Sequence, residues 1–158
     1  MLKQLGRLIW VLLFCFASAH AMAEPVLELS VKVIDQGAYG GIEAPLQIVI
    51  RDEAEWRRYW ALLHQHLAAR PQLPKIDFET QQLLLVCMGQ RASGGYQVQV
   101  QKVMHYRQHC EIVVRQFSPG AGCVEPMVLT QPYQVVATAR SGLPLEFVIT
   151  NEPRDCAR

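Results

Sequence analysis

The chain has 158 residues, of which 51% are hydrophobic, and its 15 lysines and arginines nearly balance its 14 aspartates and glutamates. A formal net charge of +1, without any basic run, provides no electrostatic footprint for nucleic acid, so we expect no nucleic-acid partner. The length suits one globular domain.

The N-terminal residues have the features of a secretory signal peptide. Lys3 and Arg7 precede a short apolar stretch, and Ala21-Met22-Ala23 then provides a small-x-small cleavage site. Ala19-His20-Ala21 is a second possible site, two residues earlier. An uncleaved anchor is the alternative, although the apolar stretch is shorter than the roughly 20 residues that a membrane span needs.

Cleavage after Ala23 defines the expected organisation of the chain. Residues 1–23 are the signal peptide, and residues 24–158 form a single domain without a visible linker or repeat. The sequence therefore predicts a periplasmic or secreted protein that is not membrane-embedded after the signal is removed.

Two strands and one helix are predicted in the first half of the domain. Residues 26–34 and 46–51 alternate between apolar and polar side chains, as half-buried strands do. A helix is expected at about residues 53–68, because Asp52 can cap its first amides and Glu55 completes a capping box.

Aromatic residues dominate one face of this helix. Its apolar side chains recur at spacings of four, three and four, which aligns Trp56, Trp60, Leu63 and Leu67. We expect this face to pack on a sheet, and an aromatic platform for a ligand is the alternative.

The second half has the pattern of β structure. Residues 83–88 form a continuous apolar run that fits a strand buried on both faces. Residues 96–104 alternate between apolar and polar side chains, which predicts a strand with one face exposed to solvent. Further strands are expected at residues 110–117, 124–130, 134–138 and 145–150. Short connections favour an antiparallel meander. The predicted fold class is therefore α+β, a mainly antiparallel sheet, either curled or a small sandwich, with the helix on one face.

Two glycine-rich loops follow the predicted strands at residues 83–88 and 110–117, which are separated by one strand of the meander. They are Ala92-Ser93-Gly94-Gly95-Tyr96 and Ser118-Pro119-Gly120-Ala121-Gly122-Cys123. The meander places both at the same end of the sheet, roughly 10–15 Å apart, so that one partner could touch both. Glycine permits close backbone approach, and arginine and tyrosine are favoured interface anchors. The predicted partner-binding surface comprises Arg91, Gly94, Gly95, Tyr96, Gly120 and Gly122. The alternative is that these loops are ordinary tight turns and Tyr96 belongs to the core.

Four cysteines remain after signal cleavage, and an even count in an exported chain permits two disulfides with three possible connectivities. The meander separates Cys110 and Cys123 by roughly 20 Å, which is beyond disulfide reach. This geometry favours the pairs Cys87–Cys123 and Cys110–Cys156. Cys87 lies in an apolar strand, so a free buried thiol is the alternative for it.

Five short motifs in order and spacing resemble the C-terminal-domain family of the protease complex subunit PrcB. They are the two glycine-rich loops, Glu55-Trp56-Arg57-Arg58-Tyr59-Trp60, Ile76-Asp77-Phe78 and Thr130-Gln131-Pro132-Tyr133. The resemblance extends from about residue 37 to 150, and Ser93 stands where threonine is expected. It implies an exported accessory or assembly subunit of a protease complex, with the protease or another protein as its partner and no chemistry of its own.

Two other functions remain open at this stage. Ser93-Gly94-Gly95-Tyr96 loosely resembles the Thr-Gly-Tyr loop of chagasin-like protease inhibitors, which present several loops at one end of a β-sandwich. A structural envelope protein without a protease partner is the other alternative.

We expect neither a metal site nor an enzyme. His64 and His66 are two residues apart on a helix and point to different faces, and His105 and His109 lie in a predicted turn without a third ligand. No nucleophile elbow or nucleotide-binding fingerprint is present in the sequence, so no catalytic residue and no cofactor are predicted.

Overall fold

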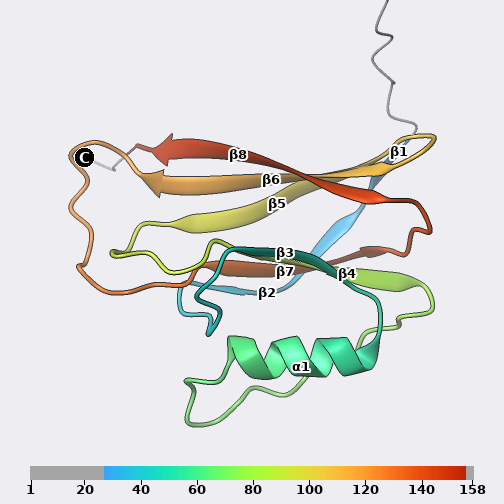
Figure 1. Ribbon diagram of the computed structural model, residues 1–158, viewed down its shortest axis with the longest axis horizontal. Coiled ribbons are helices and arrows are strands. Elements are labelled where there is room, and N and C mark those ends of the chain that lie inside the picture. Colours follow the sequence, from blue (N-terminus) through green and yellow to red (C-terminus); the bar gives the residue numbers. More distant parts are fainter. Residues whose placement is uncertain (1–26, 156–158) are drawn as a thin grey trace, which may run out of the picture.

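The computed structural model describes residues 27–155, which form two stacked four-stranded sheets and one helix (Figure 1). The first sheet has the order β1-β5-β6-β8 and the second the order β2-β7-β4-β3. The strands of the first are β1 (Leu27–Leu29), β5 (Gln97–His105), β6 (Cys110–Pro119) and β8 (Leu145–Arg154). Those of the second are β2 (Val31–Gly37), β7 (Tyr133–Ala139), β4 (Gln81–Cys87) and β3 (Leu46–Ile50). The predicted α+β class, in its sandwich form, is confirmed.

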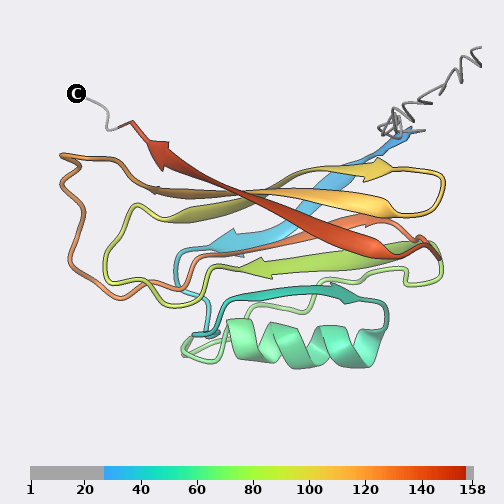
Figure 2. The same ribbon diagram turned by 45° about the horizontal axis from the view of Figure 1, so that its top comes forward.

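Helix α1 (Glu53–Leu63) covers the outer face of the second sheet, so that this sheet is the middle layer (Figures 1 and 2). One core cluster fills the space between α1 and the second sheet, and another fills the space between the sheets. Strand β4 contributes to both, Leu83 and Leu85 to the first and Leu84 and Val86 to the second. The prediction of a strand buried on both faces is thereby confirmed.

The helix begins as predicted but ends earlier than residue 68. Asp52 caps it, with its carboxylate accepting from the Glu55 amide at 2.8 Å. His64 is the C-cap with the non-helical angles φ −112° and ψ 20°, and both its amide and its ring Nδ1 lie within hydrogen-bond distance of the Trp60 carbonyl, at 3.2 and 2.9 Å. Leu67 is therefore beyond the helix and exposed.

The tryptophans belong to the core rather than to an open ligand platform. Trp56 and Trp60 are buried, and their indole N–H groups donate to the carbonyls of Pro74 and Pro71, each at 3.0 Å. The proline-containing connector thus folds back over the helix and satisfies both buried donors.

The simple meander is wrong in three places. Strand β4 pairs with β3 and β7, so the chain crosses to the other sheet before β5 instead of forming a hairpin. Only β5 and β6 form the expected hairpin, and β8 pairs with β6 in parallel. Residues 124–129 are irregular rather than a strand, with Pro126 among them.

The expected disulfide pairs are also wrong. Cys87 and Cys110 are both buried free thiols, Cys87 in the core cluster under α1 and Cys110 in the cluster between the sheets. Different layers of the fold therefore separate Cys87 from the loop that carries Cys123. Cys123 is disulfide-bonded and its Sγ lies 3.8 Å from the Arg154 carbonyl oxygen. Cys156 and the predicted signal peptide lie outside the described residues.

Candidate functional site

The two glycine-rich loops lie at the same end of the sandwich, as expected, and the first loop contacts the segment that follows the second. Arg91 and Thr130 exchange backbone hydrogen bonds of 2.8 and 3.0 Å, and the Gly94 amide donates to the Pro126 carbonyl at 2.9 Å. The Thr130 hydroxyl adds a bond of 2.9 Å to the Ser93 carbonyl. The first loop is therefore fastened to the segment that follows the second one, and the two form one rim.

Two of the predicted contact glycines have packing roles in this rim. Gly95 has φ +78°, and a Cβ there would lie 2.5 Å from the Glu125 carboxylate carbon. At Gly120 a Cβ would lie within 2.4 Å of the Arg154 carbonyl oxygen, which accepts from the Gly120 amide at 3.1 Å. These glycines permit close approach inside the protein, whereas Gly122 faces open space.

The exposed part of the rim is apolar, and the sequence-based prediction missed it. Val124 is 98% exposed, Met127 89% and Leu129 57%. Exposed apolar side chains gathered in one segment mark interaction surfaces, and methionine adapts to irregular partners. We call residues 124–129 the apolar loop. The signal was present in the sequence, since these residues are spaced three and two apart and Pro126 interrupts them.

Arg91 and Tyr96 border the rim and contact each other. The Arg91 guanidinium lies 5.6 Å from the centre of the Tyr96 ring and donates to the Met88 carbonyl at 2.9 Å. Its Nε is buried and has no hydrogen-bond partner among residues 27–155. Tyr96 is partly buried and packs against the core between the sheets. Both residues therefore support the rim as well as border it.

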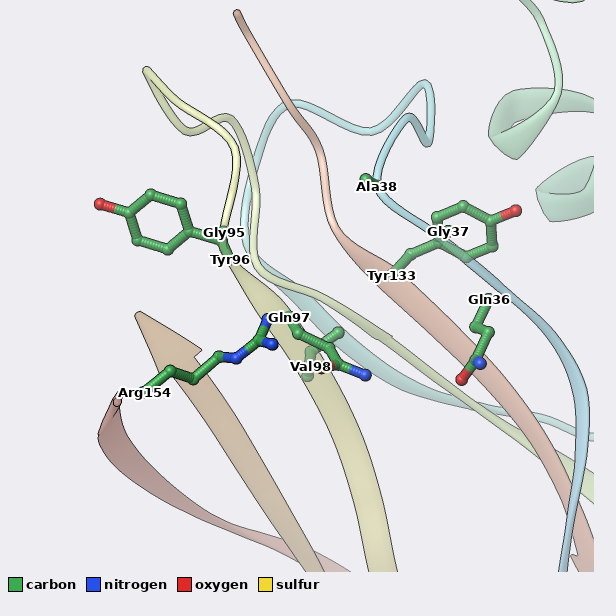
Figure 3. Close-up of a pocket in the computed structure, with 9 residues that line it drawn as sticks. All are labelled: Gln36, Gly37, Ala38, Gly95, Tyr96, Gln97, Val98, Tyr133 and Arg154. Atoms are coloured by element: carbon green, nitrogen blue, oxygen red, sulfur yellow. The ribbon is translucent and has the colours of Figure 1, made fainter. Parts of the chain in front are cut away.

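A cavity of about 310 Å³ opens between the two sheets at this end (Figure 3). Strands from both sheets contribute side chains to its wall. The lining residues are Gln36, Gly37, Ala38, Gly95, Tyr96, Gln97, Val98, Tyr133 and Arg154. Because Gly95 belongs both to this wall and to the rim, the cavity and the apolar loop are neighbours.

A buried polar cluster lies behind this cavity, on the side of α1. The Asp35 carboxylate accepts from the Tyr133 hydroxyl at 2.8 Å and lies 3.1 Å from His64 Nε2. Burial, together with the hydrogen bond to Asp35, raises the pKa of Tyr133 above its usual range, so the phenol remains protonated. Burial also raises the pKa of the nearby Cys87 thiol to about 12. The cluster is thus arranged to link α1 to β2 and β7.

The remaining histidines lie elsewhere. His109 stacks on Tyr106 with ring centres 4.8 Å apart and approaches Glu111 at 3.5 Å, in the turn between β5 and β6. This turn is at the end opposite to the rim. Within residues 27–155, no group of three or more histidine, cysteine, aspartate or glutamate side chains could hold a metal ion.

Comparison with known proteins gives a family match for part of the chain. Residues 83–139, from β4 through β7, match the family model described as PrcB C-terminal. This stretch includes both glycine-rich loops, the apolar loop and the motif at residues 130–133, and it confirms the predicted resemblance there; the motifs at residues 55–60 and 76–78 lie outside the match. The protein is therefore an α+β sandwich with a PrcB C-terminal-like region. No curated protein and no solved structure matches the chain. Among the described residues, no helix is long and apolar enough to cross a membrane.

Proposed function

We propose that the protein is an exported, non-enzymatic accessory domain that binds another protein through the rim formed by its two glycine-rich loops. The exposed apolar loop is the observation that carries this proposal. Val124, Met127 and Leu129 are held in the open by a backbone that is hydrogen-bonded to residues 91–94. A partner that covers them would gain the hydrophobic energy that the free domain forgoes.

A protease, or another subunit of a protease complex, is the partner class that we propose. Support comes from the match of residues 83–139 to the PrcB C-terminal family. The signal-like N-terminus supports a periplasmic or secreted location for the encounter.

The absence of catalysis is likewise proposed on physical grounds. The titratable groups behind the cavity have structural roles: Asp35 is engaged by Tyr133 and His64, and Cys87 is a protonated buried thiol. A raised thiol pKa disfavours the thiolate that a nucleophile requires.

Chemical crosslinking of the domain in extracts of its own source, followed by mass spectrometry, tests the proposal. We expect the domain to capture a protease or a protease-complex subunit, and Leu129→Asp to lose this capture. Leu27→Asp is the matched control, because Leu27 is 58% exposed against 57% for Leu129 and lies at the opposite end of the first sheet. Equal capture by both variants contradicts docking at the rim.

A protease inhibitor is the second candidate, because a two-sheet sandwich that presents several loops at one end suits a protease cleft. Titration of the purified domain against cysteine and serine proteases discriminates between the two. An inhibitor slows turnover at stoichiometric dose, whereas an assembly subunit leaves turnover unchanged. Capture of only wall or membrane components would instead favour a structural envelope protein.

A further inference from the structure

The cavity between the sheets contains a side-chain amide whose orientation is fixed by a chain of hydrogen bonds. The register of β5 and β6 shifts between Val100 and Lys102, and at this irregularity the Val100 amide donates to Gln134 Oε1 at 2.7 Å. A backbone N–H can only donate, so this bond identifies the oxygen of the buried Gln134 side chain.

The same chain of bonds then determines what Gln36 offers to the cavity. Gln134 Nε2 donates to Gln36 Oε1 at 2.9 Å. One lone pair of the Gln36 carbonyl is thereby engaged, and the –NH₂ group of the same amide has N–H bonds to donate to a ligand. A buried glutamine that bridges the two sheets therefore makes Gln36 a hydrogen-bond donor at the cavity wall.

The charge that lines the cavity is positive. Arg154 is the single charged residue that lines it, and Figure 3 shows its side chain reaching from the end of β8 toward Gln97. The guanidinium makes no ion pair with any residue in the described range. The nearby Asp35 is directed to Tyr133 and His64, behind the cavity.

These donors define the ligand class. A guanidinium and an oriented amide favour a group that only accepts hydrogen bonds, and a carboxylate fits the fork of an arginine. A volume of about 310 Å³ is at the lower end for small-ligand sites and suits the end of a peptide or one side chain.

We propose that this cavity binds a peptide carboxylate, either a C-terminus or an aspartate or glutamate side chain. The inference deepens the proposed function and rests on it, because the carboxylate would belong to the partner that covers the adjacent apolar loop. Gly95 is shared by the cavity and the rim, so one bound segment can reach both.

Titration of the domain with short peptides, followed by ¹H–¹⁵N NMR, tests the proposal. The probes are acetyl-Gly-Ala-Leu as the free acid, the same peptide as its C-terminal amide, and acetyl-Gly-Glu-Leu amide. We expect an acid-bearing probe to shift the side-chain amide signals of Gln36 and Gln97, and the neutral amide to leave them in place. Comparison of the two acidic probes distinguishes a terminal from a side-chain carboxylate.

Three variants sharpen the test. Arg154→Gln is expected to weaken binding of the acidic probe by about tenfold or more, as for loss of a charge-assisted hydrogen bond. Arg107→Gln, with the same change of charge in the turn at the opposite end, should leave the affinity unchanged. Gln36→Glu keeps the shape but replaces a donor by an acceptor, and it should abolish binding while circular dichroism shows an intact fold.

Equal shifts with the acid and the amide, no shift with either acid, or equal losses in Arg154→Gln and Arg107→Gln would overturn the carboxylate site. Such a result leaves the rim proposal standing, because capture through Leu129 is measured separately. Conversely, if Leu129→Asp and Leu27→Asp capture the partner equally while the acidic peptides still bind, the rim proposal fails and the carboxylate site stands.

Discussion

Replacement of Asp35 by asparagine is a direct test of the buried polar cluster. The carboxylate lies 2.8 Å from the Tyr133 hydroxyl and 3.1 Å from His64 Nε2, and the other ring nitrogen of His64 faces the Trp60 carbonyl at 2.9 Å. A carbonyl only accepts, so Nδ1 is the donor of that contact, and the Asp35 carboxylate lies against the other ring nitrogen while it accepts from the Tyr133 hydroxyl. Asp35→Asn removes the negative charge from this position.

The magnitude follows from the burial of the pair. A hydrogen bond to a charged group contributes about 1.5–3 kcal/mol, and Asp35→Asn weakens the contacts to both Tyr133 and His64. The side chain of His64 is 6% exposed but that of Asp35 is 23% exposed, so solvent screens part of the interaction. We therefore expect Asp35→Asn to lower the free energy of unfolding by about 2–3 kcal/mol. Tyr133→Phe removes one hydrogen bond and should cost about 1–2 kcal/mol.

Urea unfolding followed by tryptophan fluorescence measures both changes. Trp60 is a local reporter, because its ring centre lies 4.1 Å from that of His64. The double variant should lose less than the sum of the single variants, since both changes act on the same carboxylate. A loss below about 0.5 kcal/mol for Asp35→Asn, within the range of ordinary surface substitutions, would refute the structural role of the cluster.

Three further predictions concern the cysteines and the N-terminus. Cys87 should resist iodoacetamide until the protein unfolds. Because burial raises the pKa of this thiol from 9.0 to about 12, the protonated thiol stabilises the fold fully below pH 9.0, and this contribution is lost as the pH rises toward about 12. The free energies of unfolding at pH 8 and pH 10.5 should therefore differ less in Cys87→Ala than in the wild type. Rapid labelling of Cys87 in the native protein would contradict its burial. Non-reducing peptide mapping should give a Cys123–Cys156 crosslink, since Cys123 lies beside the Arg154 carbonyl, two residues before Cys156; a linkage to any other cysteine argues against it. Mass measurement of the exported protein should show that residues 1–23 are absent, and an intact N-terminus would contradict the signal peptide.

Local signals in the sequence were sufficient to predict the elements but not their partners. The cap at Asp52 and the double-sided burial of β4 depend on neighbours in the sequence or on composition, and both were predicted correctly. Strand pairing is non-local, and the parallel partner of β6 is separated from it by β7. One available signal was overlooked. The apolar run at residues 83–88 indicates a middle layer, whereas the alternation at residues 96–104 indicates an outer sheet, so a hairpin between them was disfavoured.

At the candidate site, too, one part could be predicted from the sequence and another could not. The common end of the two loops was predicted, because both are anchored by the β5–β6 hairpin. The packing roles of Gly95 and Gly120 depend on Glu125 and Arg154, which are distant in the sequence. The cavity depends on both sheets at once, so no local pattern could reveal it.

The position of β8 has a consequence for the biogenesis of the protein. The last strand runs alongside β6 and completes the sheet β1-β5-β6-β8, and the first strand of that sheet pairs with β5 from the second half of the chain. Such long-range pairing folds slowly. The first sheet therefore cannot be completed before β8 has been synthesised and has left the ribosome, although the strands of the second sheet are all available by then.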